Sequence, residues 1–147
     1  MNESTISMRM IPPQCVVDVV RLYRPMFATA LAAACETDAR ACVTDLVIGR
    51  RQLWGVFHGD TPGLLAMFRS EISIEPDGSR VLVLSALAGK GMRAWVHIIS
   101  DGMVDVARSI GCTAVRFAGR AAWGRVLPEV QRIGELRNGH AVFERRA

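Results

Sequence analysis

Aromatic residues, lysine and long hydrophobic runs are all scarce in this sequence of 147 residues. Aromatic side chains make up 6% of the chain, which is too few for a surface that stacks on nucleic-acid bases. Lys90 is the only lysine, so nearly all of the 18 basic residues are arginine. Because the net charge of +4 is spread along the chain in runs no longer than two, nucleic acid is not an expected partner.

Metal and export signals are also missing. No two of the four cysteines are spaced as Cys-x-x-Cys, and the three histidines are scattered, so we expect reduced thiols and no bound metal. Residues 1–12 carry Glu3 and no apolar core of a signal peptide. The apolar stretch at 26–35 is too short to span a bilayer. The sequence therefore predicts a protein that is not secreted and has no membrane contact.

Half of the residues are hydrophobic and 22% are charged, so the chain can bury a core. With no repeat, linker or low-complexity segment, we expect one domain over residues 1–147. The mean hydropathy of +0.23 is mildly high for a small monomer and favours contacts with other protein chains.

Hydrophobic periodicity predicts an alternation of strands and helices. Pro25 is expected to interrupt the first helical region, Asp38 to cap a helix, and Gly59–Gly63 and Asn138-Gly139 to form turns. We expect strands at 7–11, 52–58, 64–74, 81–87, 113–118, 132–137 and 141–145, and helices at 16–23, 26–35, 38–48, 91–110 and 121–127.

The longest predicted helix follows the most apolar strand. The strand at 81–87 is a nearly unbroken run of Val, Leu and Ala, which is typical of a central strand covered on both faces. In the helix, apolar residues recur at helical spacing, so we expect one buried face that contains Trp95, Ile99, Met103 and Val106.

A Gly-x-Gly loop joins these two elements. Gly89 and Gly91 would let the backbone approach an anion, and the N–H groups of residues 89–92 at the start of the helix would face it. Lys90 adds a positive charge. A tight turn that simply needs glycine explains the same pattern equally well.

The order of elements, this loop and the later segment 107–127 together resemble the GNAT (Gcn5-related N-acetyltransferase) family. More narrowly, the layout resembles the GNAT-like proteins encoded by tailed phages, including internal virion proteins of podoviruses. The resemblance implies an α/β (α+β) fold with a mixed, mostly antiparallel sheet and helices on both faces. It also implies that acetyl-CoA would bind at Leu87, Ala88, Gly89, Lys90, Gly91 and Met92.

Two departures from the family pattern bear on activity. Ala86 stands where the family loop usually has Arg or Gln, and Trp123 lies in the short helix where many active members have a tyrosine acid. The only tyrosine here is Tyr23, in the first helical region. The resemblance leaves one candidate catalytic residue, Glu71, at a position where some members place a carboxylate base.

These departures lead us to favour a non-catalytic GNAT-fold protein, specifically a phage virion or assembly component in a host cytoplasm or a virion. The alternative is an acetyl-CoA-dependent N-acetyltransferase that acts on an amine the sequence does not identify. In the first case, exposed arginines are expected to meet acidic groups of other protein chains. The arginines concerned are Arg93, Arg116, Arg120, Arg125, Arg145 and Arg146.

Overall fold

The computed structural model describes residues 5–59 and 63–147. Its elements follow the predicted order closely, and the predicted turn at 59–63 lies partly outside the described residues. The elements are β1 (Ile6–Ile11), the 3-10 turn η1 (Pro13–Cys15), α1 (Val16–Leu22), α2 (Arg24–Ala33), α3 (Ala39–Val47), β2 (Gln52–His58), β3 (Leu64–Ile74), β4 (Arg80–Gly89), α4 (Met92–Ser109), β5 (Ala114–Gly119), α5 (Trp123–Val126), β6 (Gln131–Glu135) and β7 (Ala141–Arg146).

The strands form one seven-stranded sheet in the order β1-β2-β3-β4-β5-β7-β6. The β1–β2, β2–β3, β5–β7 and β6–β7 pairs are antiparallel, and β4 pairs with β5 in parallel from Val81↔Ala114 to Leu84↔Phe117. The strand predicted at 81–87 is therefore central. The mixed, mostly antiparallel α/β architecture expected from the sequence is confirmed.

The chain divides into two compact units, each with its own set of contacts. Unit 1 comprises Met1–Glu71 and Ala86–Ile98, and unit 2 comprises Ile72–Ser85 and Ile99–Ala147. Strands β3 and β4 and helix α4 each contribute residues to both units. The single domain expected over residues 1–147 stays a prediction.

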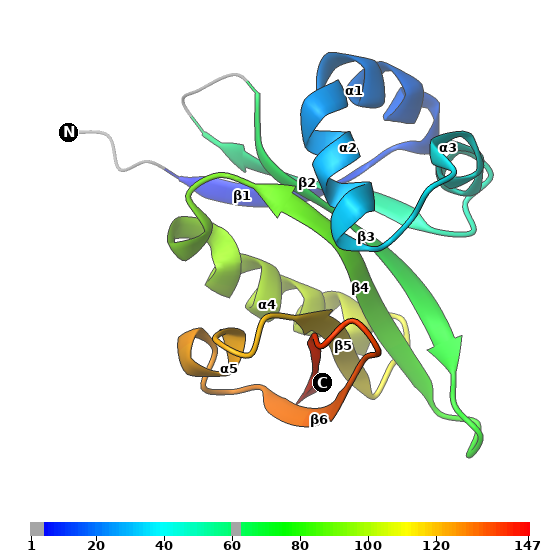
Figure 1. Ribbon diagram of the computed structural model, residues 1–147. Coiled ribbons are helices and arrows are strands. Elements are labelled where there is room, and N and C mark those ends of the chain that lie inside the picture. The colour runs from blue at the N-terminus through cyan, green and yellow to red at the C-terminus, as the bar shows by residue number, and fades with distance from the viewer. Residues whose placement is uncertain (1–4, 60–62) are drawn as a thin grey trace. The chain divides into compact units, whose positions relative to one another are not determined.

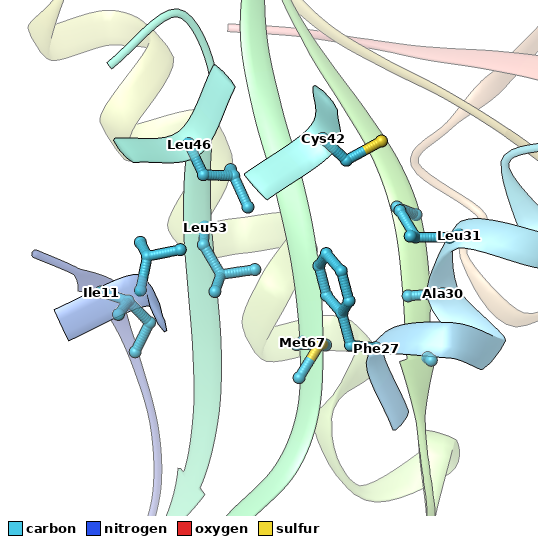
Figure 2. Close-up of a cluster of buried hydrophobic side chains, with 11 residues drawn as sticks. Ile11, Phe27, Ala30, Leu31, Cys42, Leu46, Leu53 and Met67 are labelled. Carbon is cyan, nitrogen blue, oxygen red and sulfur yellow. The ribbon is translucent and has the colours of Figure 1, made fainter. Parts of the chain in front are cut away.

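In unit 1, helices α1, α2 and α3 lie on one face of the β1–β3 sheet, and residues 92–98 of α4 lie on the other (Figure 1). Figure 2 shows the core that α1–α3 form with the sheet, in which Phe27 and Leu31 of α2 and Leu46 of α3 meet Leu53 and Met67. All five side chains are buried, so burial of apolar surface fixes α2 and α3 on the sheet.

The helix ends of unit 1 follow from local chemistry. Asp38 caps α3, because its Oδ1 accepts a hydrogen bond of 3.0 Å from the Ala41 N–H. The break near Pro25 comes one residue earlier than expected. Arg24 is already helical, and Tyr23, with φ −116° and ψ 39°, separates α1 from α2. Proline is tolerated here because the first turn of a helix needs no N–H donor from it.

Unit 2 contains β5, the β6–β7 hairpin, α5 and the second half of α4. The hairpin turns at Asn138-Gly139 as predicted, and Gly139 adopts a φ of +86°. Phe117 of β5 lies between Trp123 of α5 and Phe143 of β7, with ring centroids 6.3 and 5.4 Å away. An aromatic cluster thus joins α5 to the strands.

The buried face of α4 differs from the prediction at one residue. Trp95, Ile99 and Met103 are buried as expected, whereas Val106 is only half-buried and Ala107 is fully covered. The apolar stripe drifts around the helix because 3.6 residues make one turn. Among the described residues, no helix is both long and apolar enough to cross a bilayer.

Candidate functional site

The predicted cofactor loop is the junction of β4 and α4, and all of it belongs to unit 1. Leu87, Ala88 and Gly89 end β4, Lys90 and Gly91 form the connection, and Met92 begins α4. Ala88 is buried, so it would offer a ligand only its backbone, whereas residues 89–91 are exposed. Of the six residues predicted from the sequence to bind the cofactor, the exposed ones are Gly89, Lys90 and Gly91 of the loop.

The start of β3 holds this loop from one side. The Lys90 N–H donates a 2.9 Å hydrogen bond to the Leu65 carbonyl oxygen. A Cβ on Gly89 would lie 2.6 Å from the same oxygen and would collide with Ala66. Glycine is required at residue 89 because β3 approaches so closely. The sequence-based expectation that all N–H groups of residues 89–92 face an anion is thus wrong for Lys90, whose N–H is already bonded.

Trp95 holds the loop from the other side. Its indole Nε1–H donates a 2.6 Å hydrogen bond to the Lys90 carbonyl oxygen, and the ring is 2% exposed. In a trans peptide the carbonyl and the next N–H point in opposite directions. Because the Lys90 carbonyl points at buried Trp95, the Gly91 N–H is directed away from it. The loop peptide is therefore fixed with its donor outward.

Gly91 leaves the approach to this donor open. Its φ is +69°, a conformation that favours glycine, and a Cβ built on it would meet no atom within 4 Å. Met92 and Arg93 follow in the first turn of α4, where backbone N–H groups have no partner within the helix. Outward N–H groups at the start of an 18-residue helix, next to Lys90, make this loop a candidate site for an anion such as phosphate.

Ala86 is unusual in its backbone. Its φ is +53°, which non-glycine residues adopt rarely, and it lies inside β4, two residues after the last β4–β5 pair, Leu84↔Phe117. Its methyl group belongs to the α1–α3 core. The residue in the place of the family's Arg or Gln therefore contributes packing and an interruption of the extended strand, and no side chain that could reach phosphate. Such strain clusters at functional sites.

Glu71 is half-buried and ends the first of the two chain segments that make up unit 1. Its Oε2 accepts a 3.1 Å hydrogen bond from Arg51 Nε, and Arg51 also contacts Glu36 at 3.3 Å. The role of Glu71 as a base stays a prediction.

Trp123, which stands in place of the family's tyrosine acid, and Tyr23, the only tyrosine of the sequence, belong to different units. Trp123, in α5 of unit 2, packs edge-on against Phe117, and no titratable side chain replaces the tyrosine expected there. Tyr23, in unit 1, accepts a 3.0 Å hydrogen bond at its hydroxyl from the Leu64 N–H. The Tyr23 hydroxyl thus holds Leu64 of β3, and the next residue, Leu65, accepts the hydrogen bond from Lys90 in the glycine loop. Sequence reasoning missed this link because the partners are 41 residues apart.

Two of the arginines expected to meet a partner, both in unit 2, form ion pairs within the chain. Arg116 lies in β5 and its guanidinium binds both Glu75 and Glu144, the latter at 3.0 Å. Arg145 contacts Asp101 at 2.7 Å and Glu129 at 3.5 Å. Both guanidinium groups are therefore paired with carboxylates of the same chain, and their contact with a partner stays a prediction. Of the others named, Arg93, Arg120, Arg125 and Arg146 are exposed.

Within residues 5–59 and 63–147, no three His, Cys, Asp or Glu side chains gather in a way that could hold a metal ion. The chemistry of the described loop is that of backbone donors and one lysine.

Comparisons with known proteins place the fold. No protein-family model matches the sequence, and a search of curated proteins finds no relative. Arabidopsis thaliana NAA60 in complex with acetyl-CoA is similar in structure over 97% of this chain and 98% of its own, at 12% identity and a TM-score of 0.67. The GNAT domain of S. lividans PAT matches over 95% of this chain and 89% of its own, at 12% identity and a TM-score of 0.68.

An N-acetyltransferase from Staphylococcus aureus Mu50 matches over 97% of both chains, at 9% identity and a TM-score of 0.68. The chain therefore has the GNAT acetyltransferase fold, as the resemblance in sequence implied. Identities this low show the fold alone. The narrower resemblance to phage-encoded proteins gains no support from these structures.

Replacing Gly89 with alanine is expected to lower the free energy of unfolding by about 1–3 kcal/mol, because the new methyl group collides with β3 backbone. Gly134 in β6 is a matched control, since a Cβ there meets nothing within 4 Å. Urea denaturation of both variants measures the difference. Equal stability of the two would contradict the close approach of β3 to the loop.

Proposed function

We propose that this chain binds acetyl-CoA at the β4–α4 loop and transfers the acetyl group to an amine. The observation that carries the proposal is the fixed loop peptide. Trp95 and Leu65 hold the two sides of Lys90, so the Gly91 N–H and the first turn of α4 face outward as pyrophosphate donors. The fold supports the same ligand, because the neighbour from Arabidopsis thaliana is described in complex with acetyl-CoA.

In the proposed reaction the amine nitrogen bonds to the acetyl carbon and the C–S bond of the thioester breaks. CoA leaves as a thiol that takes up the proton lost by the amine. Since α5 offers Trp123 in place of an acid, water would carry this proton. Binding and orientation of the thioester are therefore the main contributions of the chain.

A second candidate is a non-catalytic protein that keeps the fold and acts through other protein chains, specifically in a phage virion or its assembly inside the host cytoplasm. Two observations favour loss of catalysis: Ala86 supplies no side chain for pyrophosphate, and α5 packs Trp123 in an aromatic cluster. The exposed Arg93, Arg120 and Arg125 would then meet a partner or a second copy.

Calorimetric titration with acetyl-CoA tests the binding, and Gly91→Glu is expected to weaken it at least tenfold, about 1.4 kcal/mol, through bulk and like charge at the pyrophosphate. Gly49→Glu is the matched control. Both glycines have positive φ and open space around them, but Gly49 follows α3. Both variants should lose similar stability, and only Gly91→Glu should lose affinity.

Thiol release in the presence of primary amines, from polyamines to peptide N-termini, separates the two candidates. Acetyl-CoA binding with turnover supports the transferase. Binding without turnover, together with oligomers in light scattering, supports the second candidate. No heat at millimolar acetyl-CoA would refute the proposed ligand.

A further inference from the structure

Unit 1 has a second surface that the proposed function does not use, on the outer side of helices α1, α2 and α3. A groove of about 720 Å³ opens between these helices. Its floor is apolar: Val20 of α1, Phe27 and Leu31 of α2, and Val43 of α3. Phe27 and Leu31 also belong to the core, so the floor is continuous with the core of unit 1. The groove is open to solvent, so it offers an apolar surface and not an enclosed cavity.

The sides of the groove are formed by small side chains, so the apolar floor is accessible from solvent. Ala28 and Ala32 face it from α2 and Ala39 from α3, and all three are exposed. Residues four apart lie on one face of a helix, so the two α2 alanines form one continuous wall. The part of α2 that lines the groove, from Arg24 to Ala32, is about 12 Å long at 1.5 Å per residue.

Three arginines surround this apolar floor. Arg21 and Arg24 reach it from α1 and the start of α2, and Arg40 reaches it from α3. None of the three makes an ion pair with a carboxylate of residues 5–59 or 63–147, although Arg51, Arg69, Arg116 and Arg145 all do. The only acid that lines the groove is Glu36, which is already bound by Arg69 at 2.9 Å. The groove is therefore apolar inside and positive at its edges.

We propose that this groove docks an acidic amphipathic helix of a partner protein. Apolar side chains of about two helical turns would fill the floor between α2 and α3, and acidic residues on both flanks would pair with the unpartnered arginines. The arginines come from three different helices around the floor, so several carboxylates along a peptide helix can pair with them. An amphiphile with one charged head group would leave most of them unpaired. The site is separate from the loop at residues 89–92 and does not depend on acetyl-CoA.

Fluorescence polarisation of the full chain with a labelled helical peptide tests the docking. The probe carries leucines at positions i, i+4 and i+7 with glutamates flanking them, and a scrambled peptide of the same composition is its control. The helical probe should bind at least fivefold more tightly than the scrambled one, and the difference should fall with added salt. Equal binding of the two, or equal competition by an uncharged alkyl glycoside, would overturn the proposal.

Two pairs of variants locate the binding. Ala32→Leu fills the groove, whereas Ala33→Leu changes the neighbouring exposed alanine that does not line it. Arg24→Gln removes an edge charge, whereas Arg50→Gln removes an exposed arginine elsewhere. The first of each pair should weaken the probe at least fivefold and the second should not. Affinity unchanged by both groove variants would refute the site, and acetyl-CoA titration should be the same for all four.

Discussion

Truncating Met103 to alanine is expected to lower the free energy of unfolding by about 2–5 kcal/mol, because the side chain is fully buried and the cavity would not collapse. Met103 lies in the second half of α4, within unit 2. Lost transfer free energy and lost contacts around the cavity act together at such a position. Urea denaturation followed by circular dichroism measures the loss.

Val106 in the same helix is the control. Its side chain is half-buried, so Val106→Ala is expected to cost less than about 1.5 kcal/mol. Equal losses of stability for the two variants would mean that Val106 is as deeply buried as Met103, which would contradict the buried face of α4 described above.

Glu36→Gln is expected to cost about 3 kcal/mol at neutral pH, because it removes a carboxylate that pairs with a buried guanidinium. Arg69 is 3% exposed, and its Nη2 donates to Glu36 Oε1 at 2.9 Å. Arg69 Nη1 also donates to the weakly accepting Sγ of Cys42, at 3.7 Å. Asp105→Asn is the control, since the Asp105–Arg108 pair is exposed and 3.8 Å long, and its loss should be near zero.

The effect of Glu36→Gln should depend on pH. The hydrogen bond from Arg69 lowers the pKa of Glu36, and burial opposes this less strongly. The folded-state pKa thus lies below that of the unfolded chain, so the stabilisation is complete above the unfolded pKa, near 4.3, and is lost as pH falls through the folded value. Denaturation at several pH values should show the stability difference between wild type and variant shrink below about pH 4.

Burial raises the pKa of the neighbouring Cys42 thiol, which donates to Glu36 Oε2 at 3.6 Å and stays protonated throughout this acid range. A stability difference that does not change between pH 7 and pH 3 would contradict the lowered pKa of Glu36.

Local patterns predicted the elements well, because each signal lies within a few residues. The strands at 52–58 and 64–74 have the predicted limits, and Asp38 caps α3 as expected. The glycine loop was also located, since a buried strand followed by Gly-x-Gly and an apolar stripe is visible in one short window.

The parts that could not be predicted depend on residues far apart in the chain. Arg116 meets Glu75 across 41 residues, so its neutralisation has no sequence signal. The left-handed backbone of Ala86 is equally invisible, because alanine does not favour it. The groove between α1, α2 and α3 is set by how three helices pack, and its alanines are unremarkable in the sequence.

The hydrogen bond between Tyr23 and Leu64 gives the protein a built-in spectroscopic reporter. Tyr23 is the only tyrosine among 147 residues, so isotope labelling of tyrosine produces ring signals from one place alone. That place separates α1 from α2, next to groove residue Arg24, and its hydroxyl holds the start of β3. A single pair of ring resonances would thus respond to a ligand in the groove and to a change at β3 next to the glycine loop.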